Sequence, residues 1–398
     1  MAHKDLSHLT QKQLEDLIKR YYDNEKVDNL LKEFNINISP NSLVNLFPLI
    51  PHHELFCKYC QDTNLVIRLK SRNYKYYGEN GFDLFCPMCN HNDNSSCSCD
   101  NCKKAIKQQK QIKEEEKRNL IKEKYYYDYI KTGLKNIPIE ELTLKDALYL
   151  LSVVSHSGSE NFEFIEPFSN NPSIPDLTPD RELTNRIINH LCNKGLIVIS
   201  PSSPLDAFEF DAEKKLQIYS IEKIIWELLP SMNIKEKQQY LDDVKNLVKG
   251  EWSSSWKDDI AEMWKQITSY ECIEYFKYLL AKRGFTLNEP VGDKTMNTFI
   301  GLLKNFSVGQ IFNLSWRAVS QTNDYISAEG INYTHGRNMF IGSIQRKADK
   351  AIAESWTTTN GRRDFNLPQT IISSTFFNTF LELGNEYFEN IMPTEYNK

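Results

Sequence analysis

Apolar residues recur at helical spacing three times within the first fifty residues of the chain. A helix is predicted over residues 11–22, where apolar side chains fall on one stripe behind Thr10 as the N-terminal cap. A second helix is predicted to run from a cap at Asn24 to Glu33, and a third to begin with Pro40 in its first turn. The pattern therefore predicts a small helical head over residues 1–50.

Strand-like runs follow the head, within the segment that holds most of the cysteines. Residues 65–69 form an apolar run rich in β-branched side chains, and residues 82–85 form a second short run. We take 51–102 as a Cys-rich module that contains these two strands.

A long polar stretch separates this module from the rest of the chain. Between Lys107 and Asn119 the only large apolar residue is Ile112, and neither Pro nor Gly interrupts the run. A solvated helix over 103–130 would be about 42 Å long at about 1.5 Å per residue. We take 103–139 as a charged linker helix, which either lies along a phosphate backbone or acts as a spacer with ion pairs on its surface.

The second half of the chain is mainly helical in pattern. Apolar periodicity is present in residues 221–229, 256–281, 295–305, 308–319, 338–354 and 370–391. We therefore expect a mainly α, multidomain protein with an α-helical C-terminal domain over 221–398. Phe306, Phe312 and Trp316 are predicted to be core anchors of their helices.

The segment 140–220 mixes helical and strand patterns. A helix begins with Pro179 and ends at Gly195, a strand is predicted over 196–199, and Phe208 marks a second strand after a turn rich in Pro and Ser. This order resembles the winged-helix fold. The resemblance implies a winged-helix-like α+β unit with a DNA-contacting helix and a strand–turn–strand wing.

The charges of this winged-helix-like unit support two different interpretations. The expected wing carries Asp206, Glu209 and Asp211 and no basic residue, so it would repel a phosphate backbone. Arg181 and Arg186 on the helix are the nearby cations that we expect to face DNA. The unit is therefore either a DNA-binding or a protein-binding winged helix.

Seven of the nine cysteines are crowded into one short segment. Two Cys-x-x-Cys pairs, Cys57 with Cys60 and Cys86 with Cys89, can each form a tight knuckle, and two knuckles supply the four sulfurs that structural Zn²⁺ prefers. Residues 55–90 resemble a zinc ribbon, which implies a structural zinc ion. Disulfides or an iron–sulfur cluster are the alternatives, and the absence of an export signal favours metal.

A further set of metal-binding side chains follows the second knuckle. It consists of His91, Cys97, Cys99 and Cys102. These residues could hold a second ion, so we expect one or two Zn²⁺. Alternatively, the first knuckle pairs with Cys99 and Cys102, or the set is a flexible appendage. His52 and His53 are less favoured substitute ligands, and a closed set of sulfur ligands indicates a structural rather than a catalytic metal.

Basic and aromatic residues alternate between the two knuckles. The nucleic-acid-binding set predicted there is Arg68, Lys70, Arg72, Tyr74, Lys75 and Tyr76. Basic groups attract phosphates, and aromatic rings stack on bases. The alternative is that the tyrosines pack on a neighbouring domain and the lysines are solvated. A second local group of cations lies over 335–363 and ends at Arg363, where it forms either a polyanion-binding surface or an ordinary helix surface.

Composition limits the classes of function. The formal net charge is −5, so nucleic-acid binding would require local basic patches. No run approaches the roughly 18 apolar residues of a membrane span, and the N-terminus is too polar for a signal peptide, so we expect a cytoplasmic protein with no membrane partner. The sequence carries no phosphate-binding glycine loop, nucleophile elbow or zinc-protease motif, which disfavours an enzyme.

Three functions are compatible with these patterns. The first is a non-enzymatic DNA-binding protein, either a regulator or a DNA-handling component of a mobile or defence element, with RNA as the alternative ligand. The helical head agrees with it, because its layout resembles a helix-turn-helix unit, although a cap or a dimerisation element has the same layout. The second is a protein–protein adaptor that uses the ribbon and the winged-helix-like unit as assembly surfaces. The third is an enzyme with an unrecognised active site in 221–398.

Overall fold

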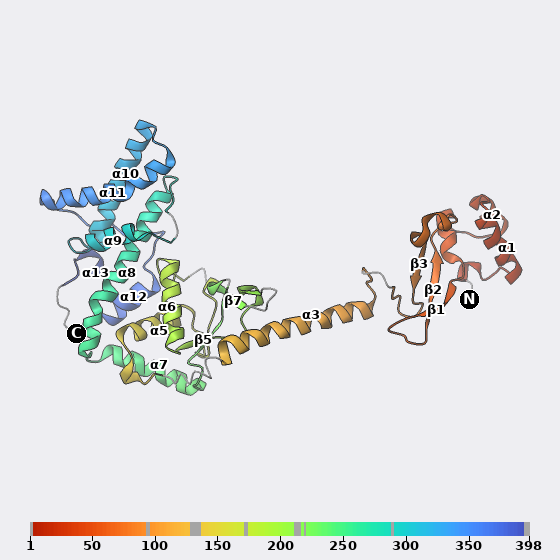
Figure 1. The fold of residues 1–398 in the computed structure, drawn as a ribbon, viewed down its shortest axis with the longest axis horizontal. Coiled ribbons are helices and arrows are strands. Elements are labelled where there is room, and N and C mark those ends of the chain that lie inside the picture. Colours follow the sequence, from red (N-terminus) through yellow and green to blue (C-terminus); the bar gives the residue numbers. More distant parts are fainter. Residues whose placement is uncertain are drawn as a thin grey trace. The chain divides into compact units, whose positions relative to one another are not determined.

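A computed structural model describes residues 3–92, 96–127, 137–170, 174–210, 216–218, 220–287 and 290–393 (Figure 1). Contacts within the chain divide it into two compact units, residues 1–116 and 117–398. The described chain is mainly helical, with a small Cys-rich β segment in the first unit and a helical C-terminal region in the second, and this confirms the expected fold class. The finer division into domains stays a prediction.

Three short helices form the head of the first unit. They are α1 (Gln11–Tyr22), α2 (Val27–Glu33) and the 3-10 helix η2 (Pro40–Leu46), preceded by η1 (Lys4–Leu6). Thr10 and Gln13 form a reciprocal capping box at the start of α1, as the sequence predicted for Thr10. The predicted cap at Asn24 is wrong: Asn24 has a φ of 67°, and α2 begins after Lys26.

The head has a small core of its own, because each helix turns one apolar stripe inward. Leu17 of α1, Leu30 of α2 and Leu43 of η2 are all fully buried in it. Tyr21 and Phe47 meet edge to face, with ring centroids 5.1 Å apart. The head is therefore held by its own packing.

A three-stranded antiparallel sheet follows the head. The strands are β1 (Ile50–Phe56), β2 (Asn64–Leu69) and β3 (Phe82–Phe85), in the spatial order β1-β2-β3. Strands β2 and β3 match the two predicted runs, whereas β1 was not predicted. The side chains of β1 are exposed on both faces, so it lacks the alternation of apolar and polar residues that marks a half-buried strand.

Helix α3 (Asp100–Ile121) begins in the first unit and ends in the second, where a π-helical turn continues it over Lys122–Tyr127. Most of its side chains are exposed up to Asn119, as the polar pattern predicted. Ile121 is fully buried in the core of the second unit. The part of the predicted linker over 128–136 lies outside the described residues.

Two α-helices, two small sheets and several 3-10 helices make up the described part of residues 137–228. Helices α5 (Leu144–Ser157) and α6 (Arg181–Asn193) pack on each other, and Gly195, with a φ of 69°, follows α6 as predicted. One sheet has the order β4-β8-β5, and the other is a β6-β7 hairpin. The strands are β4 (Phe164–Ile165), β5 (Ile197–Ile199), β6 (Phe208–Phe210), β7 (Leu216–Ile218) and β8 (Trp226–Leu228).

The predicted strand–turn–strand wing is wrong in its pairing. β5 pairs with β8, and β6 pairs with β7. All three residues of β5 are buried. Both ends of β8, Trp226 and Leu228, are buried as well, whereas β6 is more exposed, so β8 is the better partner for a buried strand. Ser200 and Ser203 help to fix this pairing, because both bond the backbone of Ile225 next to β8. Asp211 of the expected wing lies outside the described residues.

Helices fill the remainder of the second unit. They are α7 (Ile234–Lys249), α8 (Ser254–Ala281), α9 (Asp293–Leu302), α10 (Val308–Glu329), α11 (Tyr333–Ala353), α12 (Ile371–Ser374), the π-helix η9 (Thr375–Phe380) and α13 (Glu386–Glu389). Short 3-10 helices occur at η3 (Tyr74–Gly81), η5 (Ile139–Glu141), η6 (Phe168–Asn170), η7 (Leu205–Ala207) and η8 (Ile221–Lys223).

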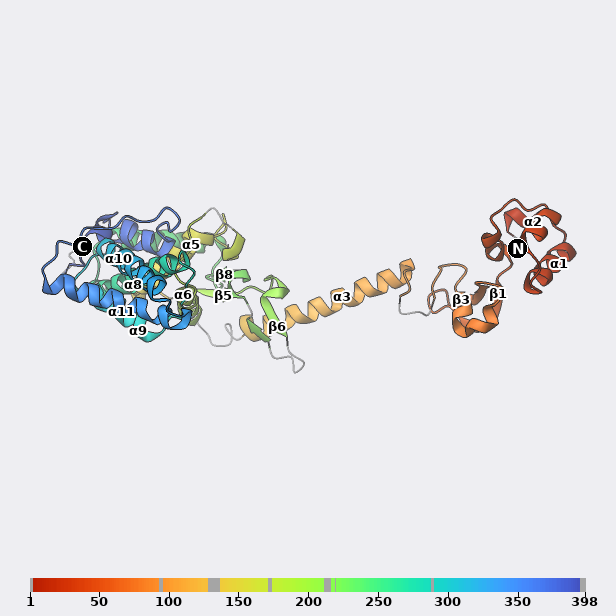
Figure 2. The same cartoon turned by 90° about the horizontal axis from the view of Figure 1, so that it is seen from above.

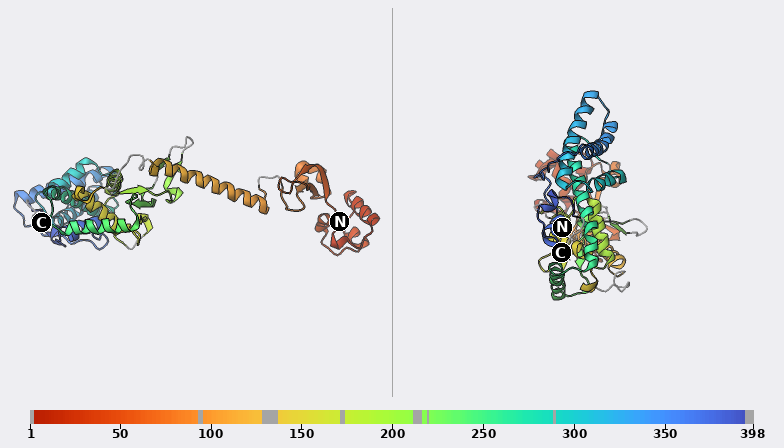
Figure 3. Two further views of the ribbon diagram at one scale, coloured as in Figure 1. Left: turned by 90° about the horizontal axis from the view of Figure 1, so that it is seen from below. Right: turned by 90° about the vertical axis from the view of Figure 1, so that its left-hand side faces the viewer.

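Helix α8 is the centre of this second core. It packs against α5, α9 and α10, all labelled in Figure 2, and against α12, labelled in Figure 1. Helices α10 and α11 lie side by side as an antiparallel pair (Figure 3). Phe306 and Phe312 are buried as predicted, but Trp316 is 53% exposed, so its predicted role as a core anchor is wrong.

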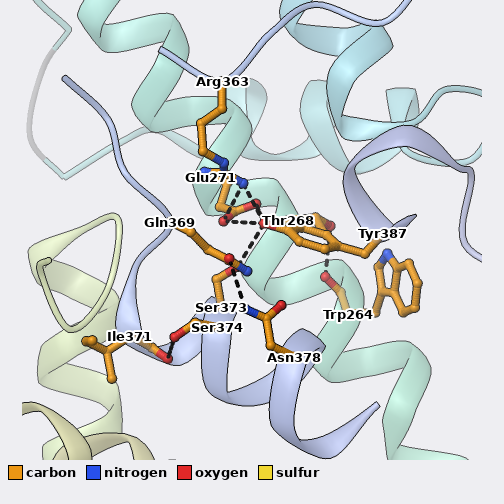
Figure 4. Close-up of polar contacts among 10 residues, drawn as sticks. All are labelled: Trp264, Thr268, Glu271, Arg363, Gln369, Ile371, Ser373, Ser374, Asn378 and Tyr387. Carbon is orange, nitrogen blue, oxygen red and sulfur yellow. Dashed lines mark hydrogen bonds and ion pairs between the residues drawn. The ribbon is translucent and has the colours of Figure 1, made fainter. Parts of the chain in front are cut away.

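A buried polar cluster ties the C-terminal segment to α8 (Figure 4). The Arg363 guanidinium lies 3.2 Å from the Glu271 carboxylate, and the Tyr387 hydroxyl donates to the same carboxylate over 3.1 Å. Ser373 lies within 3.0 Å of the Tyr387 hydroxyl. Arg363 is therefore an internal partner of Glu271 and does not belong to the predicted cationic surface over 335–363.

Within the part of the chain that the structure describes, no helix is both long enough and apolar enough to cross a membrane.

Candidate metal centres

Both cysteine knuckles lie at one end of the sheet of the first unit. β1 and β3 flank β2 and are both antiparallel to it, so they run in the same direction. Cys57 directly follows β1, and Cys86 directly follows β3. The topology thus places the first cysteine of each knuckle at the same end of the sheet.

Each knuckle is a tight turn closed by backbone hydrogen bonds. The Cys57 N–H donates to the Thr63 carbonyl over 2.9 Å, and the Cys86 N–H donates to the His91 carbonyl over 2.7 Å. Gln61 and Asn90 have φ values of 32° and 55°, at the equivalent position after each second cysteine. This left-handed conformation turns the chain back directly after each knuckle.

The first metal-binding group unites the two knuckles. Its members are Cys57, Cys60, Cys86 and Cys89, whose sulfurs all lie within 4.8 Å of one another. Cys57 Sγ and Cys89 Sγ are 3.6 Å apart, close to the roughly 3.8 Å that two sulfurs span on a tetrahedral zinc with bonds of about 2.3 Å. Cys57 and Cys86 are buried, and all nine cysteines are free, so no disulfide joins them.

The second metal-binding group lies immediately after the second knuckle. His91 Nδ1 lies 3.5 Å from Cys97 Sγ, 3.8 Å from Cys99 Sγ and 3.3 Å from Cys102 Sγ. His91 is 1% exposed and Cys97 is 8% exposed, so the group is largely closed to solvent. The exchanged arrangement, with the first knuckle paired to Cys99 and Cys102, is not the grouping found in the structure.

Helix α3 begins within this second group. Cys99 precedes the helix, and Cys102 lies in its first turn, with its N–H donating to Cys99 Sγ over 3.4 Å. A helix N-terminus favours negative charge, so this position stabilises thiolates. Backbone N–H groups of Asn92 and Cys99 lower the pKa of Cys97 to about 6.

The chemistry of both groups fits a bound cation. In the first group, desolvation, reinforced by hydrogen bonds among the thiols, raises the pKa of Cys89 to about 12. The four sulfurs therefore cannot all ionise at neutral pH unless a cation balances them. The two groups are consistent with two metal ions held by sulfur and imidazole ligands. Neither group includes His52 or His53.

Tyr59 is a residue of this region that the sequence did not single out. It lies inside the first knuckle, yet its ring meets the His91 ring of the second group edge to face at 4.9 Å. A Cys-x-x-Cys pattern leaves both intervening residues unspecified, so the motif predicts no role for Tyr59. The one signal in the sequence was its position between two metal ligands.

The predicted nucleic-acid-binding residues between the knuckles divide into two sets. Arg68 lies over the Phe85 ring, Arg72 lies over the Tyr21 ring, and Tyr74 packs against Tyr22. These three side chains are engaged in packing within the first unit.

Lys70, Lys75 and Tyr76 form the second set. Tyr76 is 88% exposed, and its neighbour Tyr77 is 56% exposed. Lys75 is also exposed, and Lys70 is half exposed, where it pairs with Asp83 over 2.9 Å. Basic and aromatic side chains thus share the surface around η3, which joins β2 to β3 at the end of the sheet opposite the knuckles.

The two predicted arginines of α6 are on the surface of the second unit. Arg181 and Arg186 have side chains that are 63% and 57% exposed. Arg181 pairs with Glu222 at 3.1 Å, and Arg186 pairs with Glu182 one turn away. Both cations therefore have an acidic neighbour.

Fold and site together define a mainly helical protein with a Cys-rich module suited to two metal ions. A 58-residue segment, 15% of this chain, is 41% identical to the uncharacterized protein RC0786 of Rickettsia conorii and covers 70% of that protein. The chain therefore belongs to the same family as this rickettsial protein. No model of a known protein family matches the chain, and no solved structure matches it.

Proposed function

We propose that this protein binds nucleic acid without acting as an enzyme, and that its Cys-rich module is a zinc ribbon that holds one binding surface in place. The observation that carries the proposal is the exposure of Tyr76 and Tyr77, 88% and 56%, beside Lys70 and Lys75. Neighbouring exposed aromatic rings near lysines can stack on bases while the lysines attract phosphates.

The proposed ligand is DNA, with RNA as the alternative, and the η3 surface favours unpaired bases. The two rings stand edge to face, with centroids 5.7 Å apart. An exposed ring stacks on a base only if the base is not already stacked within a duplex on both sides. Single-stranded or melted segments are therefore the preferred target of this surface.

A winged-helix interpretation of residues 140–220, extended to include β8, supports a second contact with nucleic acid. The sheet order β4-β8-β5 places the last strand between the first two, and the β6-β7 hairpin extends the connection from β5 to β8. In this interpretation α6 is the helix that faces the major groove, and Arg181 and Arg186 contact its phosphates. Their acidic neighbours Glu182 and Glu222 would weaken this contact relative to η3.

Binding of fluorescent oligonucleotides to the full chain tests the proposal. The affinity should fall as salt rises, with a slope near −0.7 per phosphate contact on single strands. Replacing Tyr76 and Tyr77 by Ala should weaken single-strand binding by about 5- to 150-fold, the range of about 1–3 kcal/mol for one stacked base.

Tyr325→Ala is the matched control, because Tyr325 is also an exposed tyrosine, 52%, and lies on α10 of the second unit. It should leave the affinity unchanged. A chain that binds neither DNA nor RNA at about 50 mM salt, where electrostatic contacts are strong, would contradict the proposal.

A protein–protein adaptor is the second candidate function. Phe56 at the end of β1 is 55% exposed, Leu55 beside it is 39% exposed, and Met88 in the second knuckle is 76% exposed. Exposed apolar side chains at the knuckle end of the sheet favour a protein partner over a polyanion. If this candidate holds, Phe56→Ser with Met88→Ser removes a co-purifying partner and Tyr76→Ala does not.

A further inference from the structure

One side chain of the first knuckle reaches the second metal-binding group. Tyr59 belongs to the turn between Cys57 and Cys60. Its hydroxyl lies 3.7 Å from Cys102 Sγ, and its ring meets the His91 ring at 4.9 Å with an angle of 78° between the planes. Tyr59 therefore contacts two ligands of the second group at once.

The backbone makes a second connection between the groups. Cys89 and His91 are separated by one residue, and the His91 carbonyl accepts the N–H of Cys86 over 2.7 Å. The turn that forms the second knuckle is thus closed by a residue that is itself a ligand of the second group. This backbone connection joins the second knuckle to the second metal-binding group. Tyr59 instead joins the first knuckle to that group.

We propose that Tyr59 is a positioning residue that couples the two metal sites. Its hydroxyl donates a hydrogen bond to the thiolate of Cys102, which disperses the negative charge on that sulfur and fixes its direction. The edge of its ring holds the His91 imidazole so that Nδ1 faces the three sulfurs. An ion in the first site orders the knuckle that carries Tyr59. The ordered Tyr59 then raises the affinity of the second site for its own ion.

Coupling of this kind must be reciprocal, because both ions bind to the same chain at equilibrium. An ion in the second site orders His91 and Cys102, and through Tyr59 it stabilises the first knuckle. The expected result is that the two ions bind in a cooperative manner and are lost together on chelation. The inference rests on the proposed zinc occupancy and not on nucleic-acid binding.

Titration of the metal-free full chain with Co²⁺ tests the proposal, because each thiolate-bound cobalt gives visible absorption. Tyr59→Phe keeps the ring and removes the hydroxyl, so the second equivalent should bind about 10- to 100-fold more weakly, the usual loss for a hydrogen-bonding partner of a ligand. The first equivalent should keep its affinity and its spectrum. Tyr77→Phe, which removes the hydroxyl of an exposed tyrosine in the same unit, should change neither equivalent.

A double-mutant cycle separates coupling from a merely structural effect. Cys57→Ser, which impairs the first site, should weaken the second site when Tyr59 is present. In the Tyr59→Ala background the same Cys57→Ser change should weaken the second site much less, because only the backbone connection through His91 remains.

Two equivalents that bind to Tyr59→Phe and Tyr59→Ala as tightly as to the unaltered chain would overturn the coupling while leaving zinc occupancy intact. Failure of the unaltered chain to bind any cobalt would instead overturn the zinc occupancy itself. The two failures are therefore distinguishable in one titration.

Discussion

At the scale of single residues, the sulfur ligands show how burial and charge decide between a thiol and a metal-bound thiolate. Cys57 and Cys86 are almost fully buried, and each is held at the start of a hydrogen-bonded turn. Cys192 stands outside both groups; burial raises its pKa to about 12, as it does for Cys89, but it lies in no cluster of metal ligands among the described residues. Only the clustered thiols have the partners that a cation needs, so the loss of one of them should have a specific effect.

Cys86→Ser should remove the ion of the first group. Through the coupling of the two groups it should also make the second ion easier to extract, so that the zinc content falls from two ions to one or fewer. A serine hydroxyl is a poor zinc ligand, and the three remaining sulfurs of the first group leave the ion exposed to water and chelators. Elemental analysis with a chelator challenge measures the change. Cys192→Ser is the control and should retain both ions, and a Cys86→Ser chain that also retains both would contradict the assignment of this ligand.

Asp146 makes the stability of the second unit depend on pH in the acid range. Burial alone would raise its pKa, but hydrogen bonds from His190 and Thr143, together with the charge of Lys194, outweigh burial and lower the pKa to about 2. A lowered pKa in the folded state means that the stabilisation is complete above about pH 4, the ordinary range of an Asp. It is lost as the pH falls from about 4 to about 2.

The free energy of unfolding should fall by about 2 kcal/mol, because the pKa of Asp146 is lowered by nearly two units. Free energies of unfolding measured by urea titration between pH 2 and pH 6 should therefore fall more steeply for the unaltered chain than for Asp146→Asn. The difference between the two curves isolates this one carboxyl from the others. A difference that does not change with pH would show that the lowered pKa has no consequence for stability.

At the scale of elements, the contact between α8 and the C-terminal segment includes a buried ion pair, beside aromatic packing such as that of Trp264 on Phe377. Glu271 is 1% exposed, so its carboxylate has no access to water and depends on Arg363 and Tyr387. Removing one member of such a pair leaves a buried charge without compensation, which is more costly than removing both.

Arg363→Met should destabilise the second unit by about 3–5 kcal/mol, the usual loss when a buried ion pair is broken. Glu271→Gln combined with Arg363→Met should recover much of that loss, because no buried charge remains. Denaturation by urea, followed by tryptophan fluorescence, measures both. Arg362→Met is the control at an exposed neighbouring arginine, and a loss of equal size there would contradict the argument.

The elements show where sequence patterns were sufficient and where they were not. Helix α1 and strand β3 were predicted closely, because an apolar stripe, a cap or a bounded apolar run is encoded locally. Strand β1 was missed because it is exposed on both faces, and the partner of β5 was mistaken because pairing depends on a strand, β8, that lies far along the chain.

The candidate site divides in the same way. The spacing of two Cys-x-x-Cys pairs specified the members of the first group, since each pair fixes a local turn. The packing of Arg72 and Tyr74 was not predicted, because both contact residues of the head that local patterns do not bring near. Tyr59 was missed for the same reason: its contacts with His91 and Cys102 are tertiary.

At the scale of the whole molecule, the two units have separate cores. The head and the first metal group form small apolar clusters of their own, while the large core of the second unit runs from Ile121 to Phe388. Because a small domain buries little apolar surface, the first unit should depend on its metal ions more than the second does.

Calorimetry of the full chain should therefore show two unfolding transitions, of which a zinc chelator lowers only one. The transition that does not respond to the chelator should be the one that Arg363→Met lowers, because Arg363 lies in the second core. A single transition that moves with both treatments would contradict the independence of the two units.

The composition of the metal groups has an electrostatic consequence for the whole first unit. Seven thiolates and one neutral imidazole around two divalent ions give −7 + 4, a formal charge of −3 at the knuckle end of the sheet. A loaded module would therefore repel phosphates at that end and admit them at the opposite one, where η3 presents Lys75 and Tyr76. The ions would thus give the module an electrical polarity that orients an approaching polyanion before any contact forms.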